Sequence, residues 1–164
     1  MLDRFIKPLN EEIGIGQLNL QFFDLSLFLE KIVHKFQETC KEGQFIKIQY
    51  QGRKNVRLDK GILRRIIINL LSNAVKDSEA DVIIKVDAQP QKVIFKIIDK
   101  GIGIPKADQE KLFSKNFRAT NASQIKGTGL GLFIVQTYIE LMKGTIGFKS
   151  KRNVGTTFTI TLPC

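Results

Sequence analysis

Three stretches of the chain repeat apolar residues at the three- and four-residue spacing of an amphipathic helix. They cover residues 28–40, 63–75 and 130–142, and the second has the strongest 3.6-residue period. Ser26 is a suitable N-cap for the first helix, which we expect to end at Gly43. A fourth, frayed helical pattern over 2–13 is interrupted by Pro8.

Six other segments are rich in β-branched and aromatic residues or alternate with polar ones, and we predict them to be strands. These are 45–50, 56–58, 82–86, 93–98, 145–149 and 156–162. The turn Gln89-Pro90-Gln91 joins the third and fourth as a hairpin. This order of elements favours the α+β class: a two-layer sandwich with a mixed sheet of about five strands and three main helices on one face.

Length and cysteine content narrow the class of protein. At 164 residues the chain is long enough for one domain with its own core. Cys40 and Cys164 lie far apart, without metal-ligand spacing or a visible signal peptide, and no apolar run approaches the ~20 residues of a membrane span. We therefore expect a cytoplasmic chain that makes no membrane contact itself, although a longer parent protein could be membrane-anchored.

The net charge of +10 raises the question of a nucleic-acid partner. Lysine and arginine are spread along the chain with acids between them, there are two tyrosines and no tryptophan, and no helix-turn-helix or aromatic RNA-binding pattern is present. We predict no nucleic-acid partner. A solvated surface, or a site for one small anionic ligand, explains the charge more simply.

A polar stripe borders the apolar face of the second helix. Asn69, Asn73 and Lys76 follow one another at i, i+4 and i+7. A carboxamide oxygen can bind Mg²⁺, which prefers oxygen ligands and is often shared with substrate phosphates, and the ammonium group could meet those phosphates. The alternative, an ordinary solvated helix border, stays open on this pattern alone.

Two glycine turns bracket a polar segment, 100–128, that is long for a compact domain. Asp99 ends a strand beside Gly101 and Gly103, so its carboxylate could accept a hydrogen bond from an exocyclic amino group and favour adenine over guanine. A plain Asp-Gly turn is the alternative. Gly127-Thr128-Gly129-Leu130-Gly131 leads into the third helix, whose free N–H groups could hold phosphate oxygens. The glycine spacing differs from the dinucleotide-binding fingerprint.

In combination, four motifs closely resemble the catalytic ATP-binding domain of sensor histidine kinases. They are Asn69-Leu70-Leu71-Ser72-Asn73-Ala74-Val75-Lys76, Asp99-Lys100-Gly101-Ile102-Gly103-Ile104, Leu112-Phe113 with Phe117-Arg118, and Gly127-Thr128-Gly129-Leu130-Gly131-Leu132. The resemblance implies the Bergerat ATP-binding fold, with a catalytic domain at 17–164, an ATP lid at about 101–129, and residues 1–16 as the remnant of a dimerisation helix and linker.

The resemblance also implies a role for each matching residue. Asn73 would ligate Mg²⁺, Asp99 would bind the adenine amino group of ATP, and the catalytic residues would be Asn69, Lys76 and Arg118, which act on the phosphates. The other nucleotide contacts would come from Gly101, Gly103, Ile104, Phe113, Gly127, Thr128, Gly129, Leu130, Gly131, Leu132 and Thr157.

The reaction implied is transfer of the ATP γ-phosphoryl group to a histidine. Related ATPases that hydrolyse ATP usually have a glutamate base at the position of Asn69, whereas transfer to an imidazole needs positioning and charge neutralisation more than a strong base. The chain has one histidine, His34, which lacks the family's acceptor context. The resemblance therefore implies an acceptor on a dimerisation domain in cis in a longer protein, a response regulator as the next acceptor, and an isolated chain that is monomeric and unable to phosphorylate itself.

Two positions depart from the family pattern. Asp77 stands where the family commonly has an aromatic residue near adenine, and Asn116 replaces a usual phenylalanine of the lid. These departures keep a second function open, a degenerate ATP-binding regulatory module without kinase activity. A serine kinase of the anti-sigma type is the third alternative.

Overall fold

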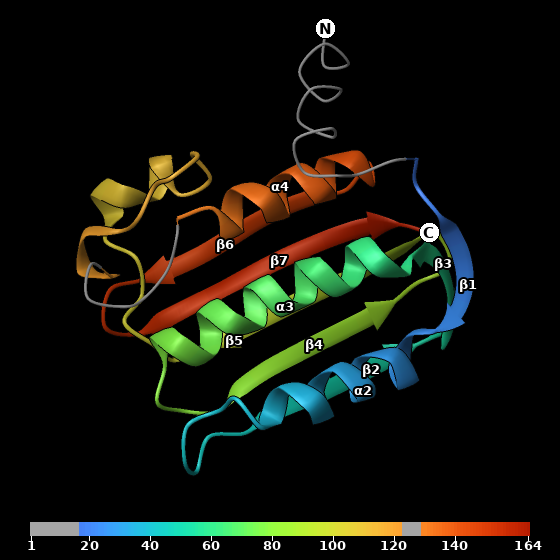
Figure 1. Ribbon diagram of the computed structural model, residues 1–164, viewed down its shortest axis with the longest axis horizontal. Helices are drawn as coiled ribbons and strands as arrows, with labels where there is room; N and C mark the ends of the chain where they lie inside the picture. The colour runs from blue at the N-terminus through green and yellow to red at the C-terminus, as the bar shows by residue number, and fades with distance from the viewer. Residues whose placement is uncertain (1–16, 123–128) are drawn as a thin grey trace, which may run out of the picture.

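The protein, seen here in a computed structural model that describes residues 17–122 and 129–164, is built in two layers (Figure 1). One layer is a five-stranded sheet in the order β2-β4-β5-β7-β6. Its strands are β2 (Ile46–Gly52), β4 (Val82–Ala88), β5 (Lys92–Asp99), β6 (Thr145–Lys151) and β7 (Gly155–Pro163). Because β2 and β4 are parallel and the other pairs antiparallel, the sheet is mixed, as predicted.

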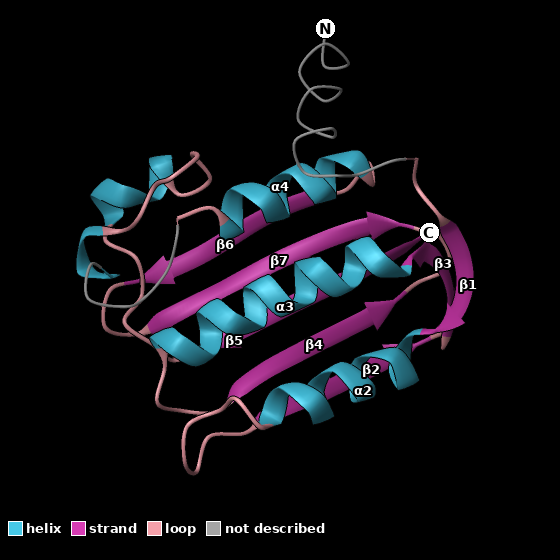
Figure 2. Cartoon of the chain, viewed as in Figure 1, coloured by secondary structure: helices cyan, strands magenta, loops and turns pink. Residues whose placement is uncertain are grey.

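The second layer consists of three helices on one face of the sheet (Figure 2). They are α2 (Leu25–Gln37), α3 (Lys60–Asp77) and α4 (Gly131–Leu141), and α3 lies between the other two (Figure 1). The apolar period of α3 is buried against the sheet, with Leu63, Ile66 and Ile67 fully inaccessible. The predicted α+β sandwich with three main helices is confirmed, and its core lies between the two layers.

A second, small sheet was not predicted. β1 (Leu20–Asp24) pairs antiparallel with β3 (Asn55–Asp59) beside the main sheet. Only the β3 half of this pair was expected from the sequence. The sequence did not predict β1, because its apolar residues Leu20 and Phe22 are exposed and the strand shows no alternation between buried and polar positions.

The bounds of α2 correct the expectation from the sequence. Asp24, not Ser26, is the N-cap, because its carboxylate accepts a hydrogen bond from the Leu27 N–H. The helix ends at Gln37 and not near Gly43, since a turn follows in which the Thr39 N–H and hydroxyl both donate to the Phe36 carbonyl.

The polar segment after β5 contains two short 3₁₀-helices, η1 (Lys106–Lys111) and η2 (Thr120–Ala122). Within the described part of the chain, no helix is both long and apolar enough to cross a bilayer. The frayed helix expected over 2–13, and the linker assigned to 1–16, lie outside the described residues.

Candidate functional site

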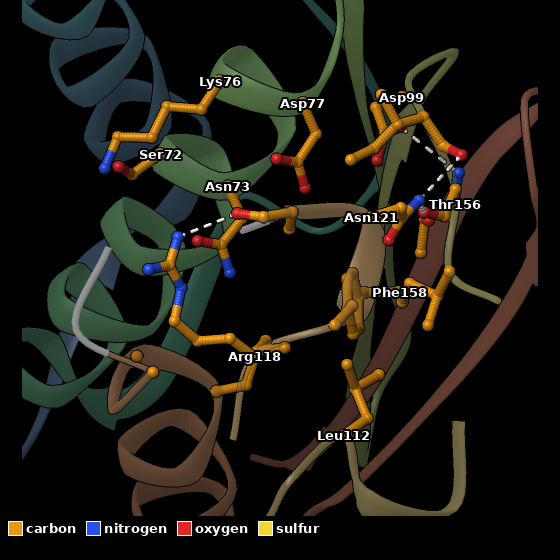
Figure 3. A pocket seen from close by; sticks show the side chains of 18 of the residues that line it. Ser72, Asn73, Lys76, Asp77, Asp99, Leu112, Arg118, Asn121, Thr156 and Phe158 are labelled. Carbon is orange, nitrogen blue, oxygen red and sulfur yellow. Dashed lines mark hydrogen bonds between the residues drawn. The ribbon is translucent and has the colours of Figure 1, made fainter. Parts of the chain in front are cut away.

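A cavity of about 220 Å³ lies between α3, the start of α4, the polar segment after β5 and the ends of β5 and β7 (Figure 3). Four motifs that are far apart in the sequence contribute to its wall. The residues predicted for the site that line it are Asn69, Asn73, Lys76, Asp99, Gly103, Ile104, Arg118, Gly129, Gly131 and Leu132. The fold thus brings most of the predicted site together in one place.

The polar stripe of α3 forms one wall of the cavity. The Nδ2 of Asn69 donates to the Arg65 carbonyl at 2.9 Å, which fixes the orientation of the carboxamide. Its Oδ1 then faces the first residue of α4, Gly131, where an added Cβ would lie 3.1 Å from that oxygen. Asn73 and Lys76 line the same wall (Figure 3). Amide oxygens beside an ammonium group suit a magnesium ion that is shared with phosphate oxygens.

Asp99 supplies a buried carboxylate at the opposite end of the cavity. Its side chain is 7% exposed, and its Oδ1 accepts hydrogen bonds from the N–H groups of Gly101 at 2.8 Å and Thr156 at 3.3 Å. Burial raises the pKa of Asp99, and these two hydrogen bonds partly oppose that effect. No described residue donates to Oδ2, so this oxygen is free to accept a hydrogen bond from a ligand.

The turn after Asp99 requires glycine. Gly103 has a φ of +63°, and a Cβ there would lie 2.0 Å from the Lys151 carbonyl oxygen. At Gly101 a Cβ would lie 2.3 Å from the carbonyl oxygen of Asp77, the acceptor for the Ile102 N–H at 3.0 Å. The turn is therefore packed directly between the end of α3 and the β6–β7 hairpin.

Asp77 also lies on the wall of the cavity (Figure 3). Burial, followed by the charge of Asp99, raises its pKa to about 6, while Lys41 and Lys76 act in the opposite direction. The position that departs from the family pattern is therefore inside the site, where the charge of Asp99 acts on it.

The second departure, Asn116, has a structural explanation. Its φ is +61°, a left-handed conformation that asparagine tolerates better than phenylalanine does. Gly129 approaches this turn so closely that a Cβ would lie 2.9 Å from the Asn116 carbonyl carbon. Asn116 thus belongs to a tight turn of the polar segment after β5, where a left-handed backbone conformation is needed.

The sequence missed the residues that hold the polar segment in place. The Oδ2 of Asp108 accepts hydrogen bonds from the N–H and the hydroxyl of Thr120, both at 2.8 Å, and these bonds lower the pKa of Asp108. Asn121 donates to the Gly103 carbonyl at 2.9 Å and lines the cavity. A single Asp or Asn in a polar loop carries no spacing signal, so no sequence pattern singles these residues out.

Several predicted site residues are not on the cavity wall. Thr157 points to the other face of β7, and its neighbours Thr156 and Phe158 line the cavity instead. Phe113 packs against Phe148, with ring centroids 5.9 Å apart. Gly101 and Leu130 also lie off the wall, although Gly101 bonds to Asp99. Gly127 and Thr128 fall outside the described residues.

Comparisons with known proteins agree on one family. The model of the "Histidine kinase-, DNA gyrase B-, and HSP90-like ATPase" family matches residues 58–164. The circadian input-output histidine kinase CikA of Synechococcus elongatus is 37% identical over 161 residues. The sensor protein kinase WalK of Staphylococcus aureus is 32% identical over 175 residues.

These relatives are longer proteins. The aligned region covers 93% of this chain but 21% of CikA, and 99% of this chain but 42% of WalK. Among solved structures, full-length ShkA in complex with AMPPNP superposes with a TM-score of 0.79 at 25% identity, covering 98% of this chain and 36% of ShkA. The catalytic domain of the histidine kinase ThkA gives 0.76 at 25% identity, covering 88% of this chain and 97% of that domain.

Proposed function

The chain belongs to the histidine kinase-, DNA gyrase B- and HSP90-like ATPase family, and on this premise we propose that it is the ATP-binding catalytic domain of a two-component sensor histidine kinase. In this proposal it transfers the γ-phosphoryl group of ATP to a histidine on a dimerisation domain. That domain would belong to the same longer protein, and a response regulator would later accept the phosphoryl group. The proposed catalytic unit is 17–164, with a lid at about 101–129.

The observation that carries the proposal is the meeting of the α3 stripe, the Asp99 turn and the start of α4 around one cavity. A buried carboxylate stands at one end, and carboxamides and an ammonium group stand at the other. This distribution matches an adenine nucleotide, whose base offers an amino donor and whose phosphates carry negative charge.

The donor set at the phosphate end fits a magnesium ion. Asn73 would provide an amide oxygen ligand, with further oxygens from the phosphates and water. Such an ion neutralises charge on the phosphates as the phosphoryl group moves. Asn69 and Lys76 would orient the phosphates from the same helix, and Gly129 and Gly131 would let the backbone approach them.

The residues present suit transfer more than hydrolysis. Asn69 cannot take a proton from water, so the chain lacks a base at the position where hydrolysing relatives have one. Transfer breaks the bond between the γ-phosphorus and its bridging oxygen to ADP and forms a bond from phosphorus to an imidazole nitrogen. Arg118, which lines the cavity and donates to the Ala122 carbonyl at 2.8 Å, would neutralise charge on the transferring group.

One observation favours a second candidate function. Asp77 places a carboxylate on the cavity wall where an aromatic side chain would have stacked near adenine. A negative charge here weakens phosphate binding and offers no stacking surface. A module that binds ATP weakly and transfers nothing is the function that this residue favours.

Calorimetric titration with AMPPNP, with and without Mg²⁺ and with a GTP analogue as control, tests the proposal. We expect saturable, adenine-selective binding, and then phosphorylation of a supplied histidine-bearing dimerisation domain by Mg-ATP. Asn73→Ala should weaken Mg-dependent binding about tenfold or more without unfolding the chain.

The outcomes separate the two candidates. Binding of AMPPNP without phosphoryl transfer from ATP would favour the regulatory module over the kinase domain. Asp77→Tyr would then be expected to tighten nucleotide binding. Absence of binding at millimolar AMPPNP would reject both candidates. Equal affinity of Asn73→Ala and the unmodified chain, with and without Mg²⁺, would reject the metal role of Asn73.

A further inference from the structure

Asn121, on η2, presents a buried oxygen without a hydrogen-bond partner. Its Oδ1 is inaccessible to solvent and meets no donor among the described residues. The Nδ2 of the same amide donates to the Gly103 carbonyl at 2.9 Å. Turning the amide over would replace this bond by a contact between two oxygens, so the orientation is fixed. A buried acceptor left unpaired destabilises the site until a donor reaches it.

A second unpaired acceptor lies at the same end of the cavity. Asp99 uses its Oδ1 for the N–H groups of Gly101 and Thr156, and no described residue donates to its Oδ2. Asp99 and Asn121 are tied to the same short turn, the first through Gly101 and the second through Gly103. Both side chains appear together at this end of the cavity (Figure 3).

The other polar groups nearby do not supply the missing donor. The hydroxyl of Thr156 pairs with the hydroxyl of Ser150 at 2.8 Å, and the Ser150 hydroxyl also lies 3.2 Å from the Gly155 carbonyl. The Ile104 N–H donates to that same Ser150 oxygen at 2.8 Å. Within the described part of the chain, two acceptors without donors therefore remain, one from Asp99 and one from Asn121.

We propose that Asn121 is a base-specificity residue whose Oδ1 accepts one N–H of the adenine exocyclic amino group, while Asp99 accepts the other. The proposal rests on the proposed function, that the cavity binds ATP. An amino group carries two N–H donors, which matches the two acceptors. Guanine would instead place a carbonyl oxygen against both of them, and neither side would gain a hydrogen bond.

The test compares two ligands and two proteins by calorimetry: ATP and purine riboside triphosphate, which lacks the amino group, with the unmodified chain and Asn121→Ala. We expect Asn121→Ala to weaken ATP binding about tenfold and to change the affinity for the purine nucleotide less than twofold. Ser114→Ala is the matched control, because Ser114 is exposed in the same segment and does not line the cavity. It should change neither affinity.

Equal weakening of both ligands by Asn121→Ala would overturn the proposal, because the side chain would then only hold the segment in place. No change in ATP affinity would overturn it as well. If the unmodified chain bound neither ligand at millimolar concentration, the proposed function itself would fail, which is a different result.

A measurement on the unmodified chain covers the case in which Asn121→Ala does not fold. N6-methyl-ATP keeps one N–H donor, so a site with a single acceptor should bind it as well as ATP. Two acceptors predict binding about tenfold weaker than ATP binding. Equal affinity for ATP and N6-methyl-ATP would overturn the role of Asn121.

Discussion

At the scale of single residues, Asp77 couples the stability of the fold to pH. Its raised pKa of about 6, against an ordinary value of 3.8, means that the folded chain holds a proton that the unfolded chain has released between about pH 4 and pH 6. Ionising this group therefore lowers the free energy of unfolding as the pH rises through this window. Above about pH 6 the full penalty is present.

We expect Asp77→Asn to be more stable than the unmodified chain at pH 7.5, by about 1–2 kcal/mol once screening of this partly exposed carboxylate is allowed for. Near pH 4 the two proteins should be nearly equal, because the carboxyl is then protonated. Urea unfolding at both pH values measures the difference, with Glu110→Gln, an exposed substitution on η1, as the control. A stability difference that is the same at pH 4 and pH 7.5 would contradict the assigned cause.

Most of the described motif residues predicted from the sequence line the cavity, whereas the sequence missed residues whose place depends on which face of a strand they lie on or on a single contact. Thr157 was chosen from a run of two threonines, and only the register of β7 shows that Thr156 faces the cavity. The place of Asn121 at the cavity follows from its hydrogen bond to the Gly103 carbonyl, which only the structure shows. Hydrophobic periodicity does not determine whether Thr156 or Thr157 faces the cavity, nor whether Asn121 does. These two placements therefore could not be predicted from the sequence.

At the scale of elements, the end of α3 is held by the loop that precedes β2. Gln44 is 1% exposed, and its Nε2 donates to the carbonyl oxygens of Ser78 at 2.9 Å and Ala80 at 3.0 Å. The Nζ of Lys41 also donates to the Ser78 carbonyl, at 2.9 Å. The Nε2 of Gln44 also lies 3.4 Å from the Val75 carbonyl and the Nζ of Lys41 donates to the Lys76 carbonyl at 3.2 Å, so the two side chains also bind carbonyls in the last turn of α3.

Gln44→Leu should lower the free energy of unfolding by about 2–3 kcal/mol, because it removes the donor to the Ala80 carbonyl, one of the two donors to the Ser78 carbonyl and the acceptor for the Lys41 N–H. The corresponding drop in Tm is about 5–10 °C for a domain of this size. Thermal unfolding followed by circular dichroism measures it. Gln49→Leu is the matched control, since Gln49 is exposed on β2 and should shift Tm little. Equal shifts for the two variants would show that α3 does not depend on this loop.

Helix and strand identities followed from periodicity, whereas their bounds did not. The 3.6-residue pattern of α3 predicted the helix within a few residues of its observed ends, because its apolar face is the centre of the core. The start of α2 depended on which of two capping residues, Asp24 or Ser26, binds the helix N–H groups. The Ser26 hydroxyl instead lies 3.3 Å from a Glu30 carboxylate oxygen, a choice that local sequence leaves open.

At the scale of the whole molecule, the arrangement of the helices separates the one histidine from the cavity. His34 is exposed on α2, while the cavity lies on the other side of α3, beside α4 (Figure 1). Self-phosphorylation within one chain would need His34 to pass around α3. Such a movement would require α2 to leave the core, in which its residues Leu25, Phe28 and Leu29 are buried.

We therefore expect no phosphohistidine on the isolated chain after incubation with γ-labelled Mg-ATP, and strong labelling of a supplied histidine-bearing dimerisation domain under the same conditions. His34→Gln should bind ATP and label the supplied domain as well as the unmodified chain does, because His34 does not line the cavity. Acid-labile, alkali-stable label distinguishes phosphohistidine from phosphoserine. Label on the isolated chain that disappears in His34→Gln would mean that two chains meet with α2 of one at the cavity of the other, and the acceptor would then lie within this domain.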